Sequence, residues 1–328
     1  MFVTDWLITA IPHASTHAAL LLILGLISLG VGGNYIVPAT IKLGTALRLS
    51  PTIIAIIVVA GGTSAPELIV SLQAALEGSA DIALGNVIGS NLSNLLLVMG
   101  LAALLGTFTL HHRTAIRTSL IMLGFTIVTI YSLHQDQAIT PMIGWILLGA
   151  TIAYLLYLTR IGDINPVPEE GQEEGPTGKT APVIIAPLCA AIGAIIALLL
   201  GADFVVTGGV VLAMQAGLSE AAIGLSIIAI GTSLPEIVAV VASVMQKRSD
   251  VALGNVLGSN IFNLGMILGI TSLVAPLPRG ADISDATLAY FGLATLLVTA
   301  LIISRMTLKR PIGVVFIGFY FAFLIMLI

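Results

Sequence analysis

The chain has 328 residues, of which 58% are hydrophobic and only 9% are charged. Ordinary soluble domains contain roughly 45–50% apolar and about 25% charged residues, so a soluble fold is excluded and lipid must surround most of the chain. The formal net charge of −4 is spread over loops, and no basic run predicts a nucleic-acid partner.

Ten segments are apolar enough to span a membrane, since one spanning helix needs about 20 apolar residues. In chain order they cover residues 17–46, 52–76, 82–107, 114–133, 138–159, 182–216, 220–245, 251–275, 284–304 and 311–328. The first and the sixth are longer than one perpendicular crossing requires, which predicts strong tilt or a break. We therefore expect an all-α integral membrane protein.

One hydrophilic stretch, residues 161–181, separates the first five spans from the last five. It contains four glutamates among glycine and proline, which favours a solvated linker over a cation site. The expected organisation is a first half over residues 1–160, the linker, and a second half over residues 182–328.

Positive charge predicts the orientation, because Lys and Arg stay preferentially on the cytoplasmic side of a membrane. In the ten-span arrangement, Arg279 alone lies on one face, and all the others lie on the opposite face: Lys42, Arg48, Arg113, Arg117, Arg160, Lys179, Lys247, Arg248, Arg305, Lys309 and Arg310. Both termini are therefore expected outside the cell membrane, and the linker in the cytoplasm.

The two halves are related by an internal repeat. Shifting the chain by 169 positions aligns residues 62–100 with 231–269 without a gap, and 17 of the 39 pairs are identical. One block reads GTSAPE and then GTSLPE, and the other reads GNVIGSNLSN and then GNVLGSNIFN. Because each half has an odd number of spans, the second copy enters the membrane from the opposite side. Such inverted repeats are typical of transporters that bind substrate near the midplane.

A glutamate lies deep within a predicted span of each half, at Glu67 and Glu236. An ionisable side chain costs about 2.5–3.5 kcal/mol at the centre of a spanning helix, so a binding role is the favoured explanation. Pro66 and Pro235 precede the two glutamates, and proline breaks the helical hydrogen-bond ladder. We expect backbone carbonyls around residues 60–63 and 229–232 to be freed for a cation.

Further oxygen atoms lie one helical turn apart on common helix faces. The pairs are Thr63 with Glu67, Ser90 with Asn94, Thr232 with Glu236, and Ser259 with Asn263. None of these groups is a thiolate or imidazole, so the set favours hard cations such as calcium over zinc or copper. The negative charge of two carboxylates would balance one calcium ion. Together with neutral ligands, it would balance two or three sodium ions.

Four other polar residues have open interpretations. Asn86 and Asn255 could be ligands or could cap broken helices, and the structural role is favoured. Asp203 and its repeat counterpart Asn34 could line an access path or satisfy local backbone groups, with neither favoured.

Two further groups have ordinary explanations. Asp81 and Asp250 lie at helix starts, where carboxylates cap helices. The pair His111–His112 is expected at the membrane interface and not at a metal.

In its two repeat blocks the sequence resembles the sodium/calcium exchanger family of the calcium/cation antiporter superfamily, and the short linker resembles the compact prokaryotic members. The resemblance implies that Glu67 and Glu236 are the central ligands for calcium and sodium, which bind as substrates without a cofactor. It implies supporting roles for the following side chains and carbonyls: Thr63, Ser64, Ala60, Ser90, Asn94, Thr232, Ser233, Ala229, Ser259 and Asn263. Some relatives, including potassium-dependent exchangers, have aspartate where this chain has Asn263, which argues against potassium co-transport.

Four functions remain in competition at this stage. Sodium/calcium antiport is favoured, and exchange of protons for calcium or another divalent ion is the alternative on the same scaffold. An intramembrane enzyme is disfavoured because a catalytic dyad needs two carboxyls that share a proton, whereas each glutamate here has its own oxygen-rich repeat. A channel would conduct without stoichiometric counter-flux. No obligate protein partner is expected.

Overall fold

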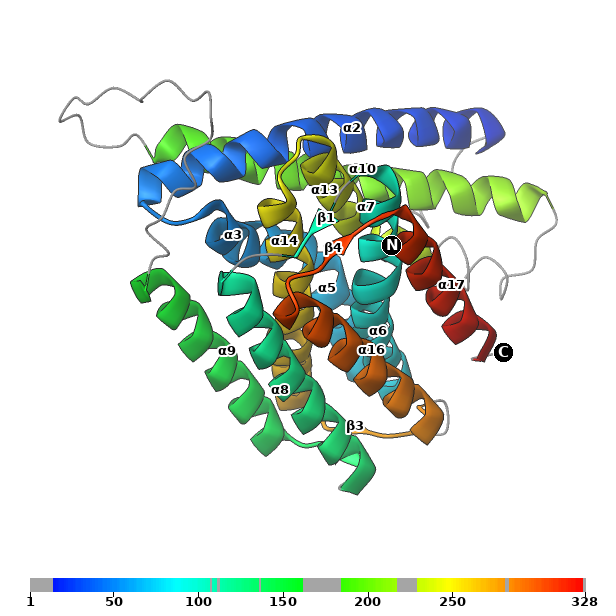
Figure 1. Ribbon diagram of the computed structural model, residues 1–328. Coiled ribbons are helices and arrows are strands. Elements are labelled where there is room, and N and C mark those ends of the chain that lie inside the picture. The colour runs from blue at the N-terminus through cyan, green and yellow to red at the C-terminus, as the bar shows by residue number, and fades with distance from the viewer. Residues whose placement is uncertain are drawn as a thin grey trace.

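The chain folds into helices joined by short connections and two very short β-ribbons (Figure 1). The computed structural model describes residues 14–106, 108–110, 113–135, 137–161, 184–216, 229–280 and 283–326. Most of the linker and the start of the seventh predicted span lie outside the described residues, as do His111 and His112.

The first half contains a long first helix, a broken second span and three further spans. Its elements are α2 (Ala14–Leu47), α3 (Pro51–Ile54), η1 (Ala55–Val59), α4 (Ala60–Thr63), α5 (Ala65–Leu76), α6 (Ala80–Leu92), η2 (Ser93–Val98), α7 (Met99–Leu105), β1 (Phe108–Thr109), α8 (Arg113–Gln135), β2 (Ala138–Ile139) and α9 (Pro141–Ile161). The segments labelled η are π-helical.

The second half follows the same order. Its elements are α10 (Ile185–Gln215), α12 (Ala229–Thr232), α13 (Leu234–Met245), α14 (Ser249–Ile261), η4 (Phe262–Ile267), α15 (Leu268–Val274), β3 (Leu277–Pro278), α16 (Asp285–Ile303), β4 (Thr307–Leu308) and α17 (Arg310–Met326). Within the described residues, seven helices have the length and apolarity to cross a membrane, and an eighth crossing results if α3–α4 and α5 form one bent span. The protein is therefore a multi-pass helical membrane protein.

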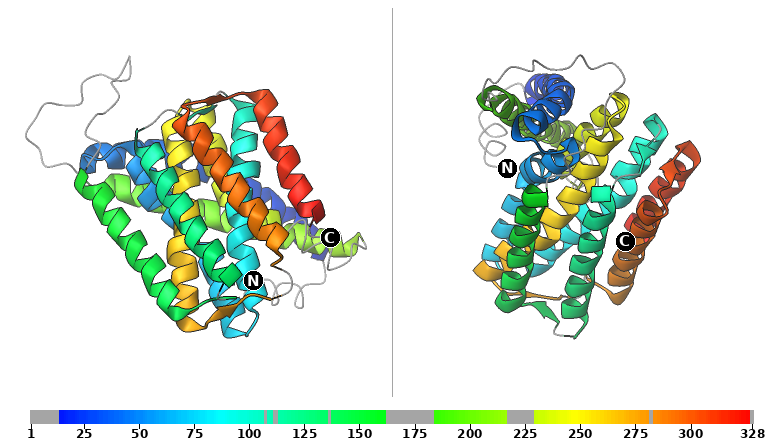
Figure 2. Two further views of the ribbon diagram at one scale, coloured as in Figure 1. Left: turned by 60° about the horizontal axis from the view of Figure 1, so that its bottom comes forward. Right: turned by 60° about the vertical axis from the view of Figure 1, so that its left-hand side comes forward.

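The two long helices, α2 and α10, lie side by side across the other helices (Figures 1 and 2). Both are continuous α-helices, of 34 and 31 residues, so their length is accommodated by inclination and not by a break. Glycine allows the close approach: a Cβ atom at Gly25 would lie 2.8 Å from the carbonyl oxygen of Gly201. The Ser28 hydroxyl donates to the carbonyl of Ala197 at 2.7 Å, and these two residues are 169 positions apart.

The short β-ribbons join the two halves reciprocally. β1 pairs antiparallel with β4, so that Phe108 faces Leu308, and β2 pairs antiparallel with β3, so that Ile139 faces Leu277. Phe108 and Leu277 are separated by the same 169-residue shift, as are Ile139 and Leu308. Under the repeat, β1 corresponds to β3 and β2 corresponds to β4. The two ribbons are therefore equivalent to each other, and each contains one strand from each half.

The most buried spans are α6–η2–α7 and α14–η4–α15, which form the centre of the bundle. Helix α14 packs closely on the second span of the first half: a Cβ atom at Gly258 would lie 2.7 Å from the Cβ atom of Ala60. At Gly254 it would lie 2.7 Å from the Thr52 carbonyl oxygen. These glycines allow the repeated oxygen-bearing segments of the two halves to meet, because any larger side chain would hold the helices apart.

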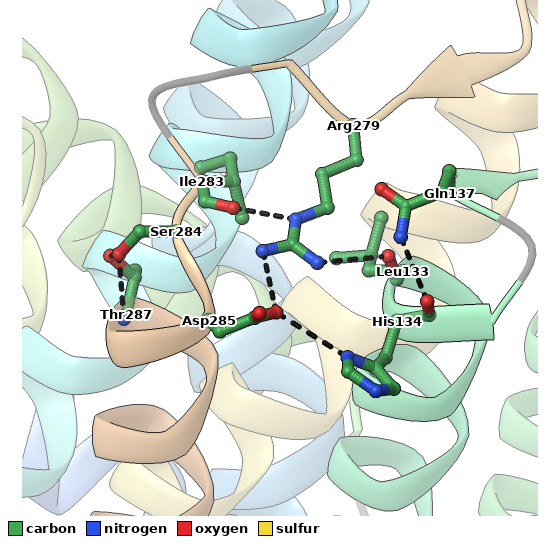
Figure 3. A network of polar contacts seen from close by, with 8 residues as sticks. All are labelled: Leu133, His134, Gln137, Arg279, Ile283, Ser284, Asp285 and Thr287. Carbon is green, nitrogen blue, oxygen red and sulfur yellow. Dashed lines mark hydrogen bonds and ion pairs between the residues drawn. The ribbon is translucent and has the colours of Figure 1, made fainter.

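Arg279 fastens the end of the bundle beside β2 and β3 (Figure 3). Its guanidinium donates to the carbonyls of Ile283 at 2.6 Å and Leu133 at 3.3 Å, and to Asp285 Oδ1 at 2.8 Å. His134 Nδ1 lies 3.3 Å from the same carboxylate oxygen. The one basic residue that the charge pattern separates from the others is thus a structural link between α8 and α16.

Candidate cation site

The second span of the first half breaks immediately before Glu67. Helix α4 ends at Thr63, Ser64 leaves helical geometry with φ −82° and ψ 9°, and α5 begins at Ala65. The two segments are bent by 45°. Pro66 lies in the first turn of α5, where its missing N–H is tolerated, so the expected proline break is confirmed. Glu67 follows in that first turn with only 1% of its surface exposed.

The equivalent break precedes Glu236 in the second half. Helix α12 ends at Thr232, Ser233 has φ −88° and ψ 1°, and α13 begins at Leu234. Glu236 lies in the first turn of α13 and is 2% exposed. Two carboxyl groups are therefore buried at two matching helix breaks.

The two breaks meet across the interface between the halves. The Ser64 hydroxyl, from the first half, donates to Glu236 Oε1, from the second half, at 3.3 Å. The hydroxyl groups of Thr63 and Ser259 also face the Glu236 carboxyl group, and the Glu67 and Glu236 carboxyl groups are close enough to interact electrostatically. Residues that are far apart in the sequence thus surround one polar centre.

Asn94 and Asn263 lie where α6 and α14 change from α-helix to π-helix. Asn94 is in η2 and Asn263 in η4, each at the second π-helical position. A π-helical turn adds one residue to a helical turn, and such turns often occur at functional sites. Nothing in the sequence predicted these π segments, because the apolar pattern around them fits an ordinary helix equally well.

Several buried oxygen atoms in this region have no hydrogen-bond partner within the protein. Among the predicted ligands, these atoms are Glu67 Oε2, Glu236 Oε2, Asn94 Oδ1, Asn263 Oδ1 and Ser259 Oγ. A buried polar group without a partner costs about 1–3 kcal/mol, and more when it is charged. A cation that accepts these oxygens as ligands would remove that cost, so the donor set fits a hard cation.

The site contains two carboxyl groups and otherwise neutral oxygens. Among the residues that the structure describes, no group of three or more His, Cys, Asp and Glu side chains could hold a metal ion. The oxygens present are carboxylate, amide and hydroxyl groups, which suit a hard cation and not the soft metals that prefer thiolate or imidazole ligands.

The Ala60 carbonyl is not freed from the helix ladder as expected, and its role as a cation ligand stays a prediction because a carbonyl oxygen has two lone pairs. The Ala60 carbonyl oxygen accepts the Ser64 N–H at 3.0 Å and the Thr63 hydroxyl at 3.4 Å. The break lies at Ser64, directly after the predicted stretch of residues 60–63. Ala229 is the first residue of α12, and its contribution stays a prediction.

The other predicted ligands lie in the helix segments that form the two breaks or precede a π-helical turn. Thr63, Ser90 and Ser233 are buried, and Thr232 is half-buried at the second break. Asn86 points back to the Glu67 region, where its amide donates to the Glu67 carbonyl at 3.0 Å. This contact favours the structural interpretation of Asn86.

The two aspartates at helix starts form different contacts. Asp81 accepts the N–H of Gly280 at 2.8 Å, so it links α6 to the connection after β3. Asp250 forms an ion pair with Arg248 at 2.7 Å. Both lie in the first turn of their helices, as the sequence indicated. Asp203 lies in α10, away from either helix end.

Comparison with known proteins identifies the family. The model of the family described as "Sodium/calcium exchanger protein" matches residues 17–160 and 187–328. The chain belongs to the sodium/calcium exchanger family. Members of this family are transporters, which excludes the intramembrane-enzyme hypothesis.

Individual relatives match over most of the chain. Inner membrane protein YrbG of Escherichia coli is 36% identical over 265 residues, which are 79% of this chain and 80% of that protein. Sodium/calcium exchanger MaX1 of Methanosarcina acetivorans is 29% identical over 349 aligned positions, which cover 94% of this chain and 97% of that protein.

A solved structure of the sodium-calcium exchanger NCX_Mj, soaked with 10 mM Na⁺ and zero Ca²⁺, superposes with a TM-score of 0.81 and 28% identity. The superposition covers 94% of this chain and 98% of that one. The resemblance drawn from the two repeat blocks is therefore confirmed, and the fold is that of a membrane exchanger.

Proposed function

We propose that this exchanger moves calcium against sodium through one site built around Glu67 and Glu236. The observation that supports this most directly is the meeting of the two helix breaks, where Ser64 of one half bonds Glu236 of the other at 3.3 Å. Two buried carboxyl groups at that junction supply two negative charges, which balance one calcium ion or a pair of sodium ions. Both ions would compete for the same oxygens, as antiport requires.

The proposed ligand set combines side chains of both halves. Glu67 and Glu236 are the central ligands, and the oxygens of Asn94, Asn263 and Ser259 that lack protein partners would complete the shell. Thr63, Ser64, Ser90, Thr232 and Ser233 would add hydroxyl groups, and Ala229 its carbonyl. Calcium takes six to eight oxygens, so a mixture of charged and neutral ligands from two halves suits it.

We further propose that the chain has ten spans arranged as two inverted halves, residues 1–160 and 182–328. The reciprocal β-ribbons and the Ser28–Ala197 bond support an equivalence of the halves, because the 169-residue shift converts the strands of one ribbon into those of the other and also relates Ser28 to Ala197. The charge asymmetry supports a cytoplasmic linker at residues 161–181 and termini outside the membrane.

Alternating access would come from α2 and α10 moving together against the helices that hold the glutamates. The close glycine contacts between α2 and α10 support their movement as one unit, since a change in either helix is transmitted by direct backbone contact. Helix α10 also lies on the breaks themselves, because Gly62 faces Ile195 and Gly231 faces Val206. Movement of α10 would therefore change access to the site.

Calcium uptake into proteoliposomes tests this function. We expect uptake when sodium inside exceeds sodium outside, and loss of uptake when the sodium gradient is removed. Uptake driven by a proton gradient alone would favour the proton/calcium alternative. Calcium flux without stoichiometric counter-flux would indicate a channel and would contradict antiport.

A further inference from the structure

Asn86 fastens the first glutamate to the helix that bears its neighbouring ligands. The side-chain amide of Asn86 in α6 donates to the backbone carbonyl of Glu67 at 3.0 Å and to Ser71 Oγ at 2.9 Å. A side-chain amide has two N–H donors, so one asparagine can hold two points of α5 that are one turn apart. We call this arrangement the Asn86 clasp.

The clasp links two parts of the proposed site. Asn86, Ser90 and Asn94 follow one another at intervals of four residues, so they share one face of α6 and its π-helical continuation. An anchor on the Glu67 carbonyl fixes the main chain from which the Glu67 carboxyl group extends. The clasp therefore sets the position of Glu67 relative to Ser90 and Asn94.

The second half has the asparagine without the clasp. Asn255 is the repeat counterpart of Asn86, and it is only 1% exposed. Neither its Nδ2 nor its Oδ1 atom has a hydrogen-bond partner within the protein. A buried amide without hydrogen-bond partners is costly. Identical asparagines at equivalent positions therefore differ in their hydrogen bonding between the two halves.

A single sequence difference accounts for part of this asymmetry. The counterpart of Ser71 is Val240, which is buried and has no hydroxyl group. Ser71 is also buried, so the two positions differ in chemistry and not in exposure. Without a hydroxyl at residue 240, Asn255 has one fewer acceptor than Asn86 and no second point of attachment to α13.

We propose that Asn86 is a positioning residue that fixes the main chain at Glu67, whereas the missing clasp at Asn255 leaves the main chain at Glu236 without that anchor. Glu236 is held instead through its side chain, by the bond from Ser64 at 3.3 Å. This inference rests on the proposed cation site. A fixed main chain lowers the cost of binding because the carboxylate that it bears is already placed for the ion. A main chain without the anchor allows the second half to adjust when ions of different number and charge bind in successive steps.

The test compares valine with threonine at one position, because these two side chains have the same shape and differ in a hydroxyl group. Ser71→Val removes the acceptor of the clasp, Ser71→Thr keeps it, and Val240→Thr supplies one to Asn255. Loss of a net hydrogen-bond contribution of about 1 kcal/mol predicts that Ser71→Val raises the half-saturating calcium concentration about fivefold. In Ser71→Thr the half-saturating calcium concentration should stay within about twofold of wild type. Comparison of the two variants therefore separates the loss of the hydrogen bond from the effect of altered packing.

The reciprocal substitution should affect a different parameter. Val240→Thr is expected to slow maximal exchange about threefold without raising the half-saturating calcium concentration, because it stiffens the adjustable half. Asn86→Ala should weaken calcium binding at least as much as Ser71→Val. Asn91→Ala is the matched control, since Asn91 is buried in the same helix but its amide bonds within that helix, to Val87 O at 2.6 Å.

Each variant is measured in two ways, by sodium-driven calcium flux and by calorimetric calcium binding to the purified protein in detergent. Wild-type flux tests the proposed function, and the ratios between variants test the clasp. Equal effects of Ser71→Val and Ser71→Thr would overturn the inference. So would a loss of affinity in Asn255→Ala equal to that in Asn86→Ala, because the two halves would then be equivalent.

Discussion

The Ser64 hydroxyl donates to Glu236 Oε1 at 3.3 Å, although the two residues are 172 positions apart and belong to different halves. The contact joins the residue at one helix break to the first helical turn after the other break. The Glu236 carboxyl group buried at this junction therefore accepts a hydrogen bond from the opposite half. Both halves contribute groups to the polar centre.

Neutralising either central glutamate should abolish calcium transport. Glu67→Gln and Glu236→Gln keep the side-chain volume but remove a charge from a buried centre, where loss of one charged partner costs about 3–5 kcal/mol. We expect calcium affinity to fall at least about 100-fold, with elution and thermal unfolding in detergent close to wild type. Glu77→Gln is the control, because Glu77 is exposed at the end of the same helix. Wild-type calcium flux in both site variants would refute the ligand assignment.

Asn263 should determine the charge of the site. Asn263→Asp would raise the number of carboxyl groups from two to three, and a buried centre then requires another cation or a proton to approach neutrality. We expect wild-type exchange to be independent of potassium and the variant to acquire a pH or potassium dependence while still binding calcium. Flux is measured across pH with and without potassium, and superimposable profiles for the two proteins would contradict the expectation.

Cysteine labelling should define the orientation. Cys189 is exposed, so it is first replaced by serine to provide a background without thiols. In that background, a cysteine at Gln172 should react with an impermeant reagent only from the cytoplasmic side, and one at Gln135 only from outside, as the distribution of Lys and Arg predicts. Labelling of both positions from one side would rule out the ten-span inverted arrangement.

Gly32 should be essential for the contact between α2 and α10. A Cβ atom there would lie 2.8 Å from the Leu198 side chain and 2.9 Å from the Ala194 carbonyl oxygen, so Gly32→Ala must push the two helices apart. Overpacking of this kind costs about 1–3 kcal/mol. A Cβ atom at Gly30 would have no other atom within 4 Å, so Gly30→Ala is the matched control. We expect Gly32→Ala to lower thermal stability and exchange rate, and equal behaviour of the two variants would contradict the proposed tight contact.

Arg279 should stabilise the end of the bundle mainly through backbone carbonyls. Its side chain is only 10% exposed, whereas that of Asp285 is 72% exposed. Arg279→Ala leaves the carbonyls of Leu133 and Ile283 without this donor and should lower the unfolding midpoint by several degrees. Asp285→Asn should have little effect, because an exposed ion pair contributes about 0–1 kcal/mol. A larger loss in Asp285→Asn than in Arg279→Ala would show that the ion pair dominates.

The sequence by itself determined the class and the family of the protein, and it predicted the two glutamates as central ligands. These follow from local or repeated features: apolar length requires lipid, proline before Glu67 and Glu236 breaks a helix, and the 169-residue repeat marks both positions as equivalent. The break was predicted, but its location at Ser64 was not, because proline limits where a helix can continue without fixing which residue leaves it.

Only the tertiary structure decided which groups meet and how the halves differ. The bond from Ser64 to Glu236, the π-helical turns at Asn94 and Asn263, and the different surroundings of Asn86 and Asn255 have no local signal. Repeat identity predicts equivalent positions, but hydrogen bonds depend on the partners that packing brings within about 3 Å. The difference between Ser71 in the first half and Val240 at the equivalent position of the second half can therefore give two identical asparagines different hydrogen bonds.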